Sequence, residues 1–155
     1  MDPIEIVIPI VPFTNVRGIV LGAPRREIAA WMGLVDGATS SENLVHVEPT
    51  TQLVTVASFD DGTTLTFLEI DWARTPKLFD VRPIVAGAEL VGRRKVVERD
   101  MRKLGHAMYR DDRESTTYCP ALGVLWGDHD GDIVRVAAWR EAAYWNGELD
   151  VLPVV

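Results

Sequence analysis

The sequence predicts an α+β fold in which two tandem units, each a helix followed by antiparallel strands, form one sheet with the helices packed on one side. Two short segments carry apolar residues at helical spacing, and several others alternate apolar with polar residues as half-buried strands do. Each half of the chain also has the same order of segments: a strand, a helix framed by two glycines, a polar loop, and two strands around an Asp-Gly turn, the second ending in tryptophan. This shared order indicates an internal repeat.

We expect a single domain, because a chain of 155 residues can bury one core without a metal ion or a disulfide. The two repeats span about residues 14–72 and 81–139. Residues 73–80, in a segment that contains prolines, form the predicted linker, and residues 140–155 form a C-terminal tail. This tail could add a strand to the sheet or to a second subunit, so a homodimer is one of the expected assemblies.

In the first unit, residues 4–13 are expected to be extended. Pro9 and Pro12 confine this segment to a sheet edge or place it outside the ladder, because proline lacks the backbone N–H that a central strand needs. A short helix then begins at Pro24, where a missing N–H costs nothing, and ends at Gly33. Its apolar stripe has helical spacing and consists of Ile28, Trp31, Met32 and Val35.

Strands are predicted after the first helix at residues 44–48, 53–59 and 64–72, and the last two flank the turn Asp60-Asp61-Gly62.

The second unit repeats this plan. Residues 83–91 are apolar and end at Gly92, and the helix that follows is interrupted or ended by Gly105. Two further strands lie around the turn Asp130-Gly131. The apolar face of the second helix consists of Val97, Met101, Leu104 and Met108.

The frame formed by Leu21-Gly22, Arg26-Glu27-Ile28 and Gly33 resembles the strand-glycine-helix-glycine signature of the BamE/SmpA-like superfamily. Two such units in tandem are similar to the architecture of the β-lactamase inhibitory protein family. The resemblance implies one sheet whose concave face is a protein-binding surface. Ala23-Pro24 replaces the Met-Thr or Met-Ser that usually follows the first glycine, and the paired cysteines and signal sequence of the secreted inhibitors are missing. The resemblance therefore implies a fold and a binding face, without a β-lactamase target.

The chain is acidic, with a formal net charge of −7, although residues 93–113 contain eight basic and four acidic residues. An acidic surface repels nucleic-acid phosphates and would suit a basic partner protein. Acidity can also serve solubility alone. The basic run from Arg93 to Lys103 is interrupted by Glu98 and Asp100 and contains no aromatic residue that could stack on bases. We therefore favour a solvated helix face there over a nucleic-acid site.

Cys119 is the only cysteine, which excludes an internal disulfide and fits a reducing compartment. The N-terminal segment carries Asp2 and Glu5 and no positive region, unlike a signal peptide. No apolar run reaches the roughly 18 residues that a membrane span needs. We expect a cytoplasmic protein with no membrane segment, in which Cys119 is a small buried residue.

The stretch Asp128-His129-Asp130-Gly131-Asp132 places three carboxylates and an imidazole within five residues, and such groups can bind Ca²⁺ or a transition metal. The spacing is not that of an EF-hand, because the glycine stands fourth and no glutamate closes a twelve-residue loop. The alternative is a hairpin turn with acidic corners. We favour the turn and expect no metal and no cofactor, and we keep Asp128, Asp130 and Asp132 as the metal candidate.

Large aromatic side chains gather at strand ends and in the C-terminal third of the chain. Tryptophan and tyrosine are enriched at interfaces, because they bury a large area with few rotatable bonds. These side chains are therefore the candidate partner-binding residues, and the alternative for each is a place in the core. They are Trp72, Tyr118, Trp126, Trp139, Tyr144 and Trp145.

The sequence contains no spacing of residues that is typical of a catalytic site. We expect a non-catalytic protein-binding module of the inhibitor or toxin-immunity type. The alternative is an enzyme or a small-molecule-binding protein with a pocket on the sheet face, in which His46 or His129 acts as a base. A deep apolar cavity where a histidine and a carboxylate converge would favour the alternative, and a shallow sheet face would favour the binding module.

Overall fold

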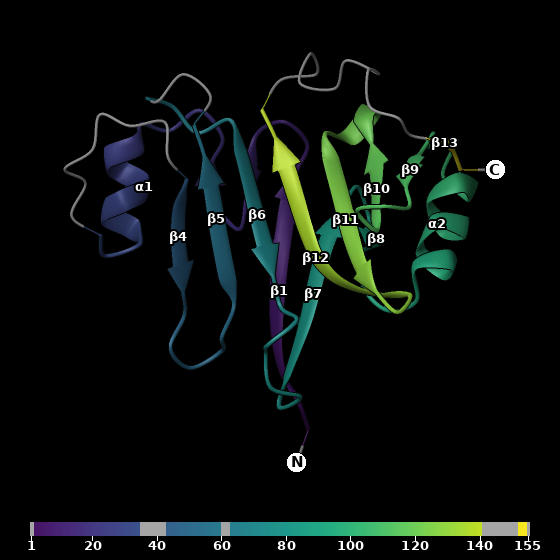
Figure 1. Cartoon of the computed structure of the whole chain (residues 1–155), viewed down its shortest axis with the longest axis horizontal. Helices are drawn as coiled ribbons and strands as arrows, with labels where there is room; N and C mark the ends of the chain where they lie inside the picture. Colours follow the sequence, from purple (N-terminus) through teal and green to yellow (C-terminus); the bar gives the residue numbers. More distant parts are fainter. Residues whose placement is uncertain (1, 35–42, 60–62, 141–151, 155) are drawn as a thin grey trace.

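The computed structural model describes residues 2–34, 43–59, 63–140 and 152–154 and consists of two β-sheets with two short helices (Figure 1). Strands make up 46% of this structure. The helices are α1 (Arg25–Trp31) and α2 (Arg94–Lys103), which lie at opposite ends of the larger sheet.

The smaller sheet has five strands in the order β3-β2-β1-β7-β8. These strands are β1 (Ile4–Val11), β2 (Asn15–Val16), β3 (Ile19–Val20), β7 (Phe79–Val85) and β8 (Ala88–Glu89).

The larger sheet has eight strands in the order β13-β9-β10-β11-β12-β6-β5-β4. These strands are β4 (Leu44–Val47), β5 (Val54–Ser58), β6 (Phe67–Asp71), β9 (Tyr109–Asp111), β10 (Thr116–Cys119), β11 (Val124–His129), β12 (Asp132–Trp139) and β13 (Leu152–Pro153). A short 3₁₀ turn, Pro120–Leu122, connects β10 to β11.

The predicted α+β class, with one sheet and helices packed on one side, is wrong, because the chain is mostly β and has two sheets. The second sheet exists because β1 and β7 pair with each other in parallel, from Ile4 beside Phe79 to Ile10 beside Val85. Every other pair of described strands is antiparallel. Both segments are visibly extended in the sequence, but no local pattern specifies a pairing between strands so far apart in the chain.

The expectation that prolines keep β1 at a sheet edge is also wrong, since β1 lies between β2 and β7. The carbonyl of Pro9 accepts a hydrogen bond from the backbone N–H of Arg17, so the nitrogen of Pro9 also points toward the β2 side. On that side only Ile10 and Val11 pair with β2. Pro9 therefore interrupts no bond of the long β1–β7 ladder.

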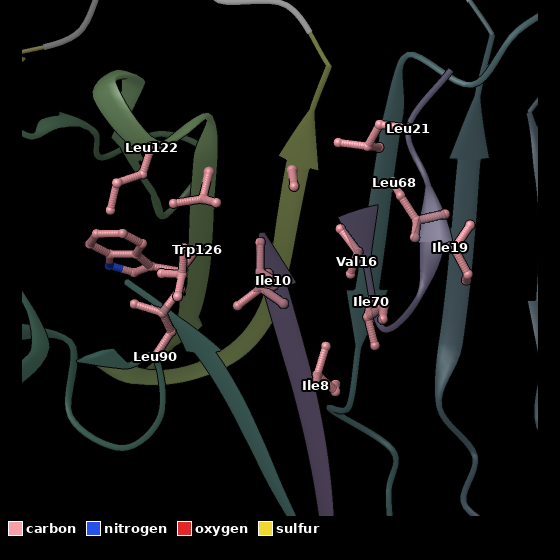
Figure 2. Close-up of a cluster of buried hydrophobic side chains, with 14 of the residues drawn as sticks. Ile8, Ile10, Val16, Ile19, Leu21, Leu68, Ile70, Leu90, Leu122 and Trp126 are labelled. Carbon is pink, nitrogen blue, oxygen red and sulfur yellow. The ribbon is translucent and has the colours of Figure 1, made fainter. Parts of the chain in front are cut away.

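The main core lies between the two sheets (Figure 2). Alternate residues of each strand point inward, so Ile8 and Ile10 of β1 meet Leu68 and Ile70 of β6 in one buried cluster. Trp126 of β11 belongs to the same cluster and is fully buried. This packing gives the fold its sandwich character and leaves the opposite surface of each sheet for other contacts.

Each helix is joined to the larger sheet in the same way. The backbone N–H of Arg25, at the start of α1, donates to the carbonyl of Thr63 at 2.8 Å, and that of Arg94, at the start of α2, donates to Gly131 at 2.8 Å. Gly131 immediately precedes β12, and Thr63 immediately precedes Thr64, which forms an isolated bridge with Pro24. The predicted division into two repeats stays a prediction, although both halves share this junction.

Most of the local predictions are confirmed. Both helices and the strands expected near residues 44–48, 53–59 and 64–72 are present. Gly33 and Gly105 follow the helices with φ of +70° and +88°, the left-handed conformation expected of a helix-ending glycine. Two residues of the expected apolar stripes differ: Trp31 is 46% exposed, and Leu104, directly after α2, is 55% exposed. Val35 of the first stripe lies outside the described residues.

Three hairpins have two-residue loops with positive φ at both positions, as type I′ turns require. The predicted Asp130-Gly131 turn is one of them and joins β11 to β12. The other two, Arg17-Gly18 and Ala86-Gly87, were not predicted, because neither arginine nor alanine favours a positive φ. The predicted Asp60-Asp61-Gly62 turn lies outside the described residues.

Candidate functional site

The candidate functional site is the surface of the larger sheet that points away from the smaller sheet, which we call the outer face. In the described part of the chain, both helices contact the opposite side. Glu98 of α2 accepts a hydrogen bond from inward-pointing Thr117, and Trp31 of α1 makes an edge contact with His46, at 5.7 Å between ring centroids. No described helix therefore covers the outer face.

Apolar side chains occupy the β4 and β5 end of the outer face. Val45 stands opposite Val56, and Val47 stands opposite Val54. Val45 and Val47 are 51% and 47% exposed. We call these four residues the valine patch. An exposed cluster of β-branched residues on a sheet is a feature of contact surfaces.

Carboxylates border the valine patch on the next strand. Glu69 and Asp71 of β6 stand directly opposite Val56 and Val54. A further exposed carboxylate, that of Glu114, lies in the loop between β9 and β10. Arg135 is the one cation among the outer-face residues of β4, β5, β6, β10, β11 and β12, so this surface has an excess of negative charge.

A hollow of about 480 Å³ lies on the same face, toward β10. The residues that line it come from four different strands and one loop. They are Phe67, Glu69, Glu114, Thr116, Tyr118, Leu125 and Arg135.

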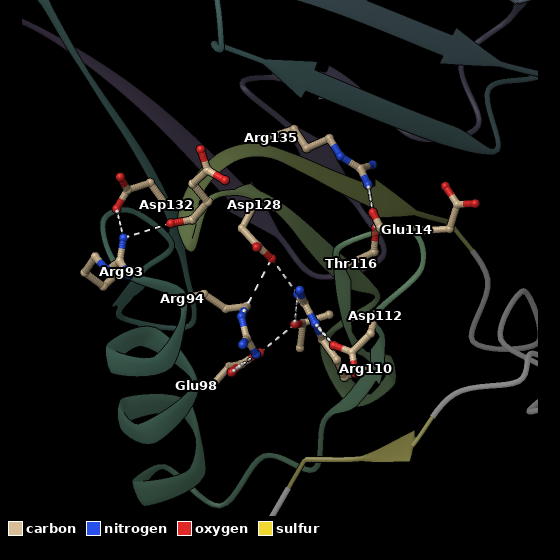
Figure 3. A network of polar contacts seen from close by, with 12 residues as sticks. Arg93, Arg94, Glu98, Arg110, Asp112, Glu114, Thr116, Asp128, Asp132 and Arg135 are labelled. Carbon is tan, nitrogen blue, oxygen red and sulfur yellow. Dashed lines mark hydrogen bonds and ion pairs between the residues drawn. The ribbon is translucent and has the colours of Figure 1, made fainter.

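Arg135 forms the floor of this hollow. Its guanidinium donates to Glu69 at 2.7 Å and to the carbonyl of Glu114 at 3.3 Å. It also donates to the hydroxyl of Thr116 (Figure 3). The side chain lies across Gly127 of β11, where an added Cβ would stand 2.1 Å from Nε. Gly127 is therefore required for the position of Arg135.

Tyr118, one of the predicted partner-binding residues, lies at the wall of this hollow and is half-buried. Burial of its ring, together with the nearby Asp111 carboxylate, raises the pKa of Tyr118, and the Arg135 guanidinium opposes this rise only in part. Its hydroxyl is therefore neutral over the physiological pH range and can both donate and accept hydrogen bonds.

None of the other predicted aromatic residues in the described part of the chain lines this hollow. Trp126 and Trp139 are both fully buried, so neither side chain can contact a partner. Trp126 belongs to the core between the sheets, whereas Trp139 points to the outer side of β12 and is buried there in a small cluster with Leu125 and Ala137. Trp72 is half-buried against the main core. Tyr144 and Trp145 lie outside the described residues.

The three aspartates of the candidate metal site point to different partners (Figure 3). Asp128 is buried and accepts a hydrogen bond from Arg110, while the exposed Asp132 pairs with Arg93 at 3.1 Å. Asp130 is exposed in the hairpin turn, and its carboxylate lies 3.5 Å from His129. Within the described residues, no group of three metal-ligating side chains converges. The Asp130-Gly131 turn predicted for this stretch is present.

Asp128 instead belongs to a buried polar network that connects α2 to the larger sheet (Figure 3). Arg94 donates to Glu98 at 3.0 Å, and Thr117 donates to the same carboxylate. Burial acts to lower the pKa of Arg110, but its hydrogen bonds to Asp128 and Asp112 raise that pKa above the usual value. The basic run at the start of α2 is thus partly neutralised inside the protein.

The two histidines considered as bases do not line the hollow. His46 is half-buried on the inner side of β4 against Trp31, and His129 is exposed in the β11–β12 hairpin. A histidine and a carboxylate therefore do not converge in this hollow.

Cys119 is fully buried, as predicted, and burial raises the pKa of its thiol to about 11. We expect iodoacetamide at pH 8 to alkylate it at least about 100-fold more slowly in the native protein than in the unfolded chain, because the thiolate is the reactive form. Mass spectrometry over a time course measures this ratio. A native rate within tenfold of the rate in denaturant would contradict the buried position.

With this geometry established, comparison with known proteins gives no relative. The chain matches no family model, no curated protein and no solved structure. Neither α1 nor α2, the helices of the described residues, has the length and apolar character that a bilayer crossing requires.

Sequence reasoning missed the residues that shape this face. Arg135, Glu69 and Gly127 are ordinary strand residues, and only the alternation along β6 and β12 could have placed the charged pair on one face. Trp31 was also missed as a surface residue, because its spacing matched the buried stripe of α1.

Proposed function

We propose that this chain is a non-catalytic protein-binding module of the inhibitor or toxin-immunity type, which binds a basic partner protein with its outer face and acts in the cytoplasm. The observation that carries the proposal is the outer face itself. It combines an exposed valine patch, a hollow with an aromatic wall and an excess of carboxylates.

Physical chemistry supports this use of the surface. Apolar side chains at the centre of a contact provide affinity, and surrounding charges set the rate of association and the choice of partner. Glu69 and Asp71 stand beside the valine patch, so a partner with apolar residues flanked by lysine or arginine would be complementary. The carboxylates would also disfavour nucleic acid, because its phosphates carry the same sign of charge.

The cytoplasmic location and the inhibitor-type activity are part of the proposal. The single buried cysteine fits a reducing compartment. Among the described residues that line the hollow there is no histidine that could act as a base, so no observation there favours catalysis. A sheet surface that binds a partner protein without catalysing a reaction is typical of an inhibitor or an immunity protein.

A matched pair of double variants tests the proposal in the organism that encodes the chain. Val45→Asp with Val47→Asp places two charges in the valine patch, while Val7→Asp with Val11→Asp changes two equally exposed valines on the smaller sheet. Each tagged protein is used to capture and cross-link its partner, which mass spectrometry then identifies and purified components reproduce. We expect at least tenfold weaker binding with the first pair and unchanged binding with the second.

Circular dichroism measures whether the two double variants fold. We expect both to fold, because all four valines are exposed and surface substitutions usually cost little stability. The proposal would be overturned if no purified partner bound the chain. It would also be overturned if binding were lost with the Val7 and Val11 pair and kept with the Val45 and Val47 pair.

A further inference from the structure

We propose that the hollow on the outer face binds an aromatic side chain, tryptophan or tyrosine, carried by the partner protein. This inference rests on the proposed function and names the group that anchors the partner. It follows from the floor, the walls and the charges of the hollow.

The floor is a fixed, planar cation. The hydrogen bonds of Arg135 to Glu69, Thr116 and Glu114 occupy edges of the guanidinium, and one planar face lies on Gly127. Arg135 also lines the hollow and its side chain is 26% exposed, and a bound ring would lie on its opposite planar face. A guanidinium with occupied edges and an accessible face is a platform on which an aromatic ring stacks, through cation–π and dispersion attraction.

The walls are apolar and suit the edges of a ring. Phe67, Tyr118 and Leu125 surround the platform. Aromatic pairs prefer edge-to-face or offset contacts, which Phe67 and Tyr118 can provide to a ring lying on the floor. The volume, about 480 Å³, lies within the roughly 300–1,000 Å³ range of ordinary binding pockets.

The charges of the hollow disfavour an anion. Arg135 and Glu69 neutralise each other at 2.7 Å, so an anion would meet the remaining carboxylate of Glu114. A neutral ring avoids this repulsion. The exposed Glu114 carboxylate can accept a hydrogen bond from an indole N–H or a phenol O–H, which aliphatic side chains cannot donate.

The test is an NMR titration of the full ¹⁵N-labelled chain with N-acetyl-tryptophanamide, with N-acetyl-leucinamide and N-acetyl-argininamide as comparison probes. We expect the tryptophan probe to shift the backbone signals of Leu125, Gly127 and Thr116, with at least tenfold higher affinity than either comparison probe. Equal affinity for the three probes, or shifts confined to other surfaces, would overturn the inference.

Two variants locate the interaction. Arg135→Lys keeps the charge and removes the planar face, and Tyr118→Ala removes a wall; each is expected to weaken the tryptophan probe at least fivefold. Arg82→Lys is the matched control, because Arg82 is a strand arginine paired with Asp80 at 2.8 Å on the smaller sheet. An equal loss with Arg82→Lys would overturn the assignment, and the wild-type titration stands even if a hollow variant fails to fold.

The two proposals can fail separately. If a partner depends on the valine patch but the tryptophan probe does not bind the hollow, the aromatic anchor is wrong and the protein-binding function stands. If the probe binds the hollow but no protein partner exists, the protein-binding function is wrong and the hollow is a site for a small aromatic molecule.

Discussion

Replacing Trp126 with alanine is expected to lower the free energy of unfolding by about 3–5 kcal/mol. Trp126 is fully buried in the core cluster that includes Leu90 and Leu122 (Figure 2). Alanine would leave a cavity between the two sheets, because a closely packed core relaxes only in part. Urea unfolding followed by circular dichroism measures the loss.

Trp31→Ala is the control for this experiment, since it removes the same side chain from a position that is 46% exposed. We expect the control to cost less than half as much as Trp126→Ala. A Trp126→Ala protein with native stability and lost partner binding would contradict the buried position and restore the partner-binding role predicted from the sequence.

Replacing Asp128 with alanine is expected to cost about 1–3 kcal/mol, because it leaves the partly buried Arg110 with the exposed Asp112 carboxylate as its remaining ionic partner. Arg110 would lose its hydrogen bond to Asp128, and Arg94, whose Nε lies 3.8 Å from that carboxylate, would lose a second neighbouring negative charge. Chemical unfolding measures the effect. Because the partners of Asp128 are arginines, we expect the stability of the wild type to be unchanged by EDTA.

Asp130→Ala is the matched control, because Asp130 lies two residues after Asp128, in the hairpin turn, and its side chain is 92% exposed. Its cost is expected to stay within about 0.5 kcal/mol, as for most surface changes. If Asp128→Ala and Asp130→Ala destabilised the protein equally, and Ca²⁺ or Zn²⁺ raised the stability of the wild type, the metal interpretation would replace the ionic network.

The local elements could be predicted because their causes are local. Gly33 and Gly105 end helices for a reason that lies in their own backbone, and the Asp130-Gly131 turn follows from residues that tolerate positive φ. The class of the fold could not be predicted in this way, because it depends on which strands pair with each other. Pro9 and Pro12 suggested that this segment lies at a sheet edge. The nitrogen of Pro9 instead faces β2, so the pairing of β1 with β7 is not interrupted.

The candidate site could be predicted only in part, for a related reason. Tyr118 was selected for its chemistry and does lie on the outer face. Trp126 was selected on the same grounds, but it points to the inner side of β11, where the smaller sheet covers it. Without knowledge of a second sheet, nothing distinguishes the two sides of that strand. Arg135 carried no signal, since its role comes from the absence of a side chain at Gly127 on a neighbouring strand.

The parallel pairing of β1 with β7 also bears on how the chain folds. Ile4 and Phe79 are 75 positions apart, so this pair forms only after a long loop has closed. Loop closure carries an entropic cost that is met before the new contacts stabilise the chain, and such topologies fold slowly. The hairpins of the larger sheet can form early from neighbouring residues. The smaller sheet must instead wait until the chain has been made as far as β8, which ends at Glu89.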